Sequence, residues 1–338
     1  MKLTPSILLA IEIAVIFLAG CDIVAGPMGC PGAGFEYGHT PTDGTVANPS
    51  CLPAFGNRAF DGCGILVGAD GIVIDPDHVH GWARITIQMY NKITTAFNEH
   101  DTEFSFDFVH FQFTYPPDWD LVPAAEKKKL AIEIAEYAAF QDGIWHETAS
   151  WYGYSTLIFP DFESAFSYED IYCDRLGTKV GAEALQKGGN VTRNVTTIRN
   201  TYFRKFRFVN RIRGLKIIEK GKGTHWDDKS HHLDIRKPVK WRNMDIGTGD
   251  GLINPVIIPV NENSKALEQT LAIPVPKLDH LNSVNLKMKL TITALAPKTG
   301  TVKSRARIND PIEPQRDYPK IIETIVKDAK RRGYNVSY

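Results

Sequence analysis

The sequence predicts an α+β fold, in which a helical half packs with a mostly antiparallel, strand-rich C-terminal half. Apolar residues recur at helical spacing in three segments between residues 75 and 187. Polar and apolar residues then alternate from Val284 to Ile292, as in a strand with one buried face. The composition, 43% hydrophobic and 23% charged over 338 residues, is that of a folded globular chain. We expect a single domain over residues 50–338, helical over 75–187 and strand-rich over 190–338.

Residues 1–20 have the pattern of a secretory signal peptide. A positive start at Lys2 precedes the apolar run Leu3–Ala19, which ends in Leu18-Ala19-Gly20-Cys21. A membrane span needs about 20 apolar residues, and this run is shorter and contains Pro5 and Glu12. We therefore favour a cleaved signal over an uncleaved membrane helix.

The tetrapeptide that ends in Cys21 resembles a bacterial lipobox. The resemblance implies acylation of Cys21, including a palmitate-type chain, and anchoring to a membrane of the cell envelope. Asp22 resembles the residue that retains such proteins at the inner membrane. We thus expect the periplasmic face of the inner membrane rather than the outer membrane.

Residues 21–49 are expected to form a tether, and a hairpin is expected at residues 65–74, with its turn at Gly68–Gly71.

An oxidising compartment permits disulfides among Cys30, Cys51 and Cys63. Cys173 is then either a fourth partner or a buried thiol, and the pairing stays open.

Capping residues set the ends of the predicted helices. Asp75 and Pro76 begin the first helix, Gly153 ends the second, and Ser167 with Asp170 forms a capping box for the third. A final helix should begin at Pro319 and end before Gly333. The predicted ranges are 76–97, 123–152, 168–185 and 319–332.

Four polar side chains from the three helices could converge on one site. His78, His146 and Glu169 are the residue types that bind zinc with an open position for water. Glu147 could then act as the general base on that water. The His146-Glu147 pair is similar to the helix of gluzincin-type zinc peptidases, but Ser150 stands where that pattern has its second His.

Two other interpretations of these four residues remain open. An inward histidine is often only hydrogen-bonded, and a glutamate near a helix N-terminus is favoured by the helix dipole. The same residues could also line a binding pocket that holds no metal.

A basic segment follows the helices. Residues 193–220 contain nine Lys or Arg and one acidic residue, Glu219. The net charge of zero and the secretory signal disfavour nucleic acid as a partner. Anionic lipid headgroups, an envelope polymer or a protein are the alternatives, and ordinary strands with alternating basic and apolar residues would also explain the pattern.

Five sequence blocks form a recognisable pattern along the chain. In chain order they are Cys51–Gly56, Asp75–Val79, Trp145–Gly153, Ser164–Asp170 and Asp245–Pro255. Together they resemble a family of predicted bacterial envelope lipoproteins, the domain-of-unknown-function 4056 family. In that family an adjacent cysteine pair is usual where Cys51-Leu52 stands, and Asn is usual where Asp174 stands.

The sequence therefore supports two functional hypotheses. The first is a membrane-anchored envelope lipoprotein that is a zinc-dependent hydrolase of an envelope substrate. The second is a lipoprotein without catalytic activity that binds or assembles envelope components through its strand half and basic segment.

Overall fold

The structure, a computed structural model, describes residues 65–154, 165–226, 239–261 and 264–338. Within these ranges it combines helices with small, mostly antiparallel sheets, which confirms the α+β class. The predicted signal peptide, the tether, Cys21, Cys30, Cys51 and Cys63 lie outside the described residues.

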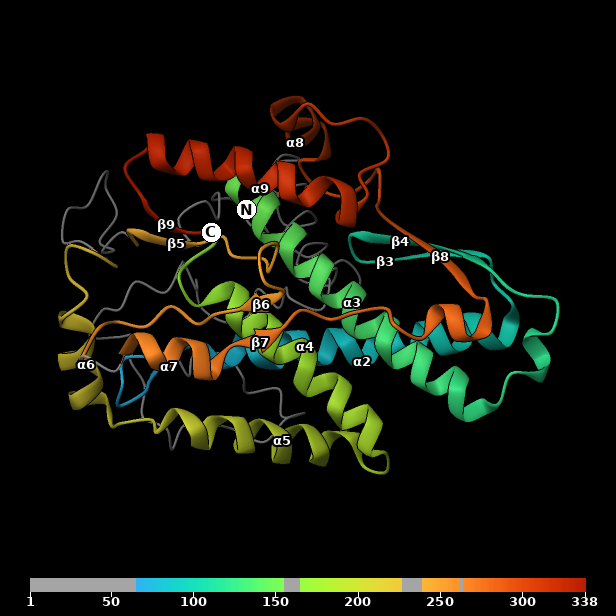
Figure 1. Ribbon diagram of the computed structural model, residues 1–338, viewed down its shortest axis with the longest axis horizontal. Coiled ribbons are helices and arrows are strands. Elements are labelled where there is room, and N and C mark those ends of the chain that lie inside the picture. The colour runs from blue at the N-terminus through green and yellow to red at the C-terminus, as the bar shows by residue number, and fades with distance from the viewer. Residues whose placement is uncertain (1–64, 155–164, 227–238, 262–263) are drawn as a thin grey trace, which may run out of the picture.

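Three long helices cross at the centre of the molecule and supply nearly half of the buried residues of its main core (Figure 1). They are α2 (Pro76–Glu99), α3 (Ala124–Trp151) and α4 (Asp170–Lys187). Trp82 of α2 is fully buried where these helices meet, because a Cβ at Gly143 of α3 would lie 3.2 Å from its ring and one at Gly177 of α4 would lie 2.8 Å from its Cβ.

The predicted caps explain where these helices begin and end. The Asp75 carboxylate accepts the N–H groups of Asp77 at 2.7 Å and His78 at 3.3 Å, as an N-cap should. Gly153 follows α3 with φ +81°, a conformation that favours glycine. Helix α4 begins two residues later than predicted, although Asp170 accepts the Ser167 N–H at 2.7 Å as expected for half of a capping box.

Glycines allow α2 and α4 to pack closely. A Cβ at Gly177 would lie 2.6 Å from the Val79 carbonyl oxygen, and one at Gly181 would lie 2.8 Å from the Ala83 oxygen. No real Cβ approaches a backbone oxygen this closely, so a larger residue would push the helices apart. The two glycines are one helical turn apart and face α2 together.

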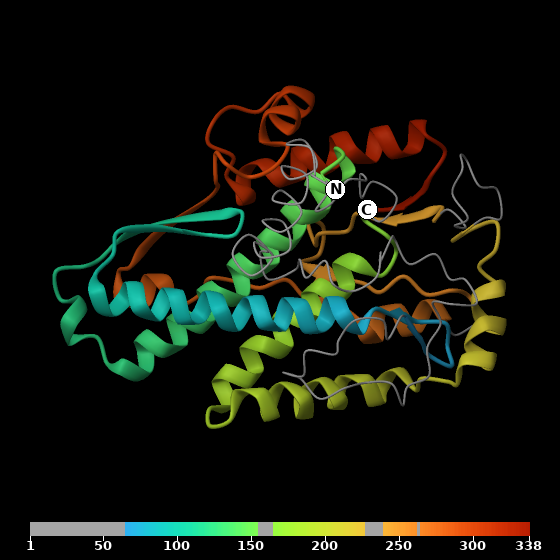
Figure 2. The same ribbon diagram turned by 180° about the vertical axis from the view of Figure 1, so that it is seen from behind.

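The predicted hairpin is present, with β1 (Leu66–Val67) antiparallel to β2 (Val73–Ile74). At the opposite end of the molecule, β3 (Glu103–Phe106), β4 (Val109–Thr114) and β8 (Lys287–Ile292) form an antiparallel sheet (Figures 1 and 2). The predicted alternation holds in β8 up to Leu290, and Thr291 and Ile292 are then both buried.

The prediction of strands is wrong for residues 191–219. These residues form α5 (Val191–Phe206) and α6 (Arg211–Glu219). Asn190 and Asn210 cap them by accepting the N–H groups of Arg193 at 2.9 Å and Arg213 at 3.0 Å. A buried stripe at helical spacing outweighs the strand preference of the many β-branched residues in α5.

The C-terminal part contains further helices and short strands. The predicted last helix begins at Pro314, five residues earlier than expected, so Pro319 lies inside it. No helix of the described ranges is both long and apolar enough to span a membrane. The remaining elements are the 3-10 helices η2 (Trp119–Leu121) and η4 (Leu281–Val284), helices α7 (Ser264–Leu271), α8 (Thr299–Ala306) and α9 (Pro314–Arg331), the parallel pair β5 (Trp241–Asn243) and β9 (Asn335–Ser337), and the antiparallel pair β6 (Leu252–Ile253) and β7 (Ile273–Pro274).

Candidate functional site

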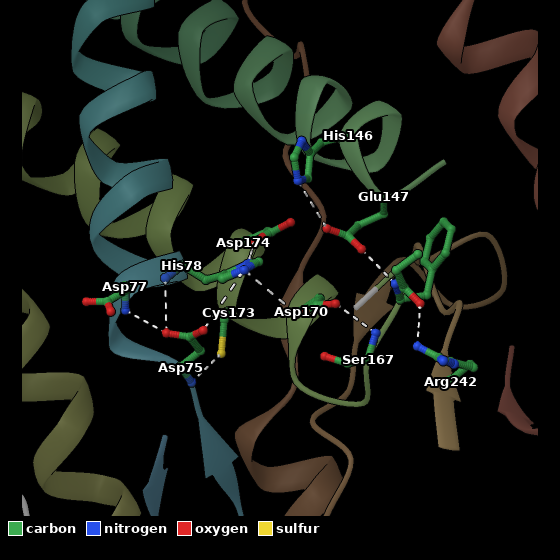
Figure 3. A network of polar contacts seen from close by, with 12 residues as sticks. Asp75, Asp77, His78, His146, Glu147, Ser167, Asp170, Cys173, Asp174 and Arg242 are labelled. Carbon is green, nitrogen blue, oxygen red and sulfur yellow. Dashed lines mark hydrogen bonds and ion pairs between the residues drawn. The ribbon is translucent and has the colours of Figure 1, made fainter. Parts of the chain in front are cut away.

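Imidazole and carboxyl groups gather where the start of α2, the last turns of α3 and the first turns of α4 meet (Figure 3). We call this group the polar cluster. It contains three of the four side chains predicted to converge on one site, together with three aspartates. Its members are Asp75, His78, His146, Glu147, Asp170 and Asp174.

His78 lies among three carboxylates. Its Nδ1 is 2.8 Å from Asp174 Oδ1, a hydrogen-bonding distance between side chains 96 residues apart in sequence. Its Nε2 is 3.9 Å from Asp170 Oδ1 and 4.0 Å from Asp75 Oδ2. The imidazole therefore has a fixed orientation, held through Nδ1.

The neighbouring carboxylates favour protonated His78. Burial alone would lower the pKa of His78, but the hydrogen bond and charge of Asp174, with the charges of Asp75 and Asp170, raise it well above 6.5. Burial raises the pKa of Asp174 to about 6, against the effect of His78. At neutral pH this pair is consequently an imidazolium–carboxylate ion pair.

His146 has the opposite electrostatic setting. Burial and then the nearby charge of His78 lower the pKa of His146 to about 4, so its ring is neutral at pH 7. Its Nε2 lies 4.0 Å from Glu147 Oε1. Both imidazoles reach solvent, with side chains 21% exposed for His78 and 18% for His146.

Glu147 ties α3 to the segment before α4. Its Oε2 accepts the Phe166 N–H at 2.6 Å. Burial, followed by the charges of Asp170 and Asp174, raises the pKa of Glu147 well above its ordinary value. Strand β5 supports the same segment, since Asn243 N–H donates to the Phe166 carbonyl at 2.9 Å and Arg242 Nη1 donates to the Ala165 carbonyl at 2.9 Å.

Glu169 and Cys173 are both buried at the start of α4. Glu169 is 2% exposed at the N-cap position, so its predicted inward direction is correct. Cys173 is a free, buried thiol rather than a disulfide partner, and its Sγ accepts the Asp75 N–H at 3.3 Å. Burial raises the pKa of the Cys173 thiol well above its ordinary value, which keeps it protonated and unreactive.

The structure brings His78, His146 and Glu147 into one cluster and gives His78 aspartates as its partners. In the described part of the chain, no three His, Cys, Asp or Glu side chains are arranged so that they could hold a metal ion. The assignment of His78, His146 and Glu169 as zinc ligands, and of Glu147 as general base, stays a prediction.

The sequence alone explains Asp75 and Asp170 as helix caps and indicates no role for Asp174. Both capping roles are present, but the same carboxylates also surround His78. The signal that could have found them is local: Asp170 and Asp174 are four residues apart, hence on one face of α4.

A substitution at Asp174 tests the electrostatics of the cluster. Asp174→Asn keeps a hydrogen-bonding group but removes the negative charge, so the pKa of His78 should fall. NMR titration of the His78 ring measures this directly. The matched control is Asp120→Asn, which removes the carboxylate 3.1 Å from the exposed His100 and should leave His78 unchanged. An equal His78 titration in wild type and Asp174→Asn would contradict the assignment.

Comparisons with known proteins identify the chain at the level of a family. No curated protein and no solved structure matches it. One family model, described as protein of unknown function (DUF4056), matches residues 39–248. The match includes the first turns of α2, the end of α3 and the start of α4, so the whole polar cluster lies inside it. The chain belongs to the DUF4056 family of proteins of unknown function.

Proposed function

We propose that this chain is a lipid-anchored protein of the bacterial cell envelope and that its polar cluster is the active site of a hydrolase. One observation carries the catalytic part. Two imidazoles reach solvent beside carboxyl groups that are almost fully buried, with side chains 1% exposed for Asp75 and Asp174 and 5% for Asp170. Burying acidic groups is costly, and helix capping accounts for Asp75 and Asp170 but not for Asp174, which pairs with His78.

Opposite protonation states support a division of roles between the imidazoles. His146, neutral at pH 7, can accept a proton from an attacking water. His78, charged at pH 7, can donate a proton to the leaving group. Asp174 acts through His78 by holding the ring and stabilising its charge. Environments that push the pKa values of neighbouring groups apart are typical of acid–base pairs.

The charge of the cluster narrows the class of substrate. His78 is the single cation of the cluster, and Asp174 balances its charge. Burial raises the pKa of Asp170 and Asp174, yet with Asp75 these side chains leave the cluster without excess positive charge. A phosphate ester would therefore not be attracted to such a site. We therefore propose an uncharged scissile bond, an ester, amide or glycosidic bond, in an envelope substrate.

The zinc-dependent form of this proposal places the metal on His78, His146 and Glu169, with Glu147 as base. The neutral ring of His146 suits a metal ligand. His78 would first have to lose its proton and its ion pair with Asp174. We therefore assign the acid–base steps to the protein's own groups and include the metal content in the experiment.

The rival is a lipoprotein that binds or assembles envelope components without catalysis. It is favoured by the structural hydrogen bonds of Asp75, Glu147 and Asp170, each of which accepts a backbone N–H. In this case the cluster would serve only to join α2, α3 and α4.

Hydrolysis of model substrates separates the two. The full chain is assayed on p-nitrophenyl acetate, a p-nitroanilide peptide and p-nitrophenyl glycosides, with zinc measured in the same sample. We expect one class to be hydrolysed, and His146→Gln or His78→Gln to lower kcat at least about 100-fold. Activity should rise with pH as His146 loses its proton at about 4 and fall once His78 loses its own.

The control for this experiment is His110→Gln, which changes a histidine of β4 outside the cluster. It should leave the activity unchanged. Hydrolysis that survives both cluster substitutions, or a wild type inactive on every class, would contradict the catalytic proposal. Stoichiometric zinc that is lost in His146→Gln would instead support the metal-dependent form.

The anchor has its own test. Cys21→Ser removes the proposed acylation site, so the protein should move from the membrane fraction to the soluble fraction of lysed cells. Metabolic labelling with a palmitate analogue gives a second readout, which should disappear with the substitution. An unchanged membrane fraction with no incorporated label in the wild type would contradict lipidation.

A further inference from the structure

Helices α5 and α6 follow one another at the periphery of the molecule (Figures 1 and 2). From Val191 to Lys220 these helices and their connection contain one acidic residue, Glu219, which lies at the end of α6 and pairs with Lys222. We call their exposed cations the α5–α6 basic surface. Its members are Arg193, Arg204, Lys205, Arg207, Arg213, Lys216 and Lys220.

Among the residues that the structure describes, most of this charge has no carboxylate partner. Arg207 pairs with Asp70, but among the described residues no carboxylate pairs with Lys205, Arg213 or Lys216. Helix α9 shows the usual alternative, since its exposed Lys327 pairs with Glu323 within the same helix. Unpaired like charges repel one another, so the surface gains from a partner that carries negative charge.

The surface also carries exposed apolar groups. Ile212 is 70% exposed between Arg211 and Arg213. A depression of about 340 Å³ opens beside the end of α5 and is lined by Asn200, Phe203, Arg204 and Phe208. The rings of Phe203 and Phe208 pack edge to face at 5.3 Å and form its apolar lining. Cations next to apolar side chains on a helix are typical of surfaces that lie on membranes.

We propose that the α5–α6 basic surface binds the headgroup region of an anionic phospholipid bilayer. The cations would contact lipid phosphates, while Ile212 and the aromatic depression at Arg204 would contact the outer acyl region. The choice of a bilayer over an anionic polymer rests on the proposed anchor at Cys21, which would hold the chain at such a surface. Contact with the bilayer would fix how the polar cluster is turned toward the envelope.

Vesicle binding tests this proposal without acylation. The full chain carrying Cys21→Ser is sedimented with vesicles of phosphatidylglycerol and phosphatidylcholine, or of phosphatidylcholine alone. The apolar N-terminal run can bind both kinds of vesicle. We therefore compare the ratio of the affinity for anionic vesicles to the affinity for phosphatidylcholine vesicles, in which this contribution cancels. We expect Lys205→Glu, Arg213→Glu and Lys216→Glu together to lower binding to the anionic vesicles at least about 100-fold, and raised salt to weaken the wild type.

The matched control reverses three exposed lysines elsewhere and causes the same change in net charge. It should keep preferential binding to anionic vesicles, and circular dichroism should show that both variants are folded. The control substitutions, on α2, α3 and α9, are Lys92→Glu, Lys129→Glu and Lys330→Glu.

Three outcomes would overturn the proposal. The wild type could bind both kinds of vesicle equally, or both triple variants could lose binding to the same extent. The wild type could also bind inorganic polyphosphate but not anionic vesicles, which would identify an anionic polymer as the partner. None of these outcomes bears on acylation, because the chain used in this experiment lacks Cys21. Failure of the proposal for the α5–α6 basic surface can therefore be distinguished from failure of the proposed lipid anchor.

Discussion

The close packing of α2 on α4 is the contact on which the rest of the site depends. Gly177 and Gly181 leave room for the backbone oxygens of Val79 and Ala83, so the two helices lie closer than side chains would normally allow. His78 is one residue before Val79, and Asp174 is one helical turn before Gly177. The contact that brings the backbones together therefore also brings the imidazole and the carboxylate to 2.8 Å. Gly143 of α3 completes the junction, because a Cβ there would lie 3.2 Å from both Trp82 and Asp174.

The polar cluster shares its side chains with the ends of the helices. Asp75 caps α2, Asp170 caps the turn before α4, and Glu147 holds the same turn against α3. Each carboxyl group is thus fixed by a backbone N–H before it faces an imidazole. This double use gives a rigid arrangement, which acid–base catalysis requires. Because the same residues serve both purposes, they are needed whether the protein is a hydrolase or a binding protein without catalytic activity. Only a measurement of activity separates these two functions.

Local signals in the sequence predicted a large part of this structure, and long-range contacts account for most of what they missed. Caps and apolar periodicity located α2, α3 and α4 to within a few residues, and alternation located β8. Helix α5 was missed because β-branched residues favour strands, although Asn190 and the buried residues Val195, Arg199, Phe203 and Phe206 have helical spacing. The inward direction of His78 and Glu169 follows from periodicity. His78 pairs with Asp174 rather than with Glu169, and this choice depends on the distance between α2 and α4. A single sequence does not reveal that distance.

The pKa of His78 in a Gly177→Ala variant tests this account most directly, because neither member of the ion pair is changed. The added methyl group would meet the Val79 oxygen and force α2 away from α4. We expect the pKa of His78, measured by NMR titration, to fall toward its ordinary value of 6.5. Gly300→Ala in α8, where a Cβ would meet nothing within 4 Å, should leave the titration as in the wild type. An unchanged His78 pKa in a folded Gly177→Ala protein would contradict the claim that this helix contact builds the site.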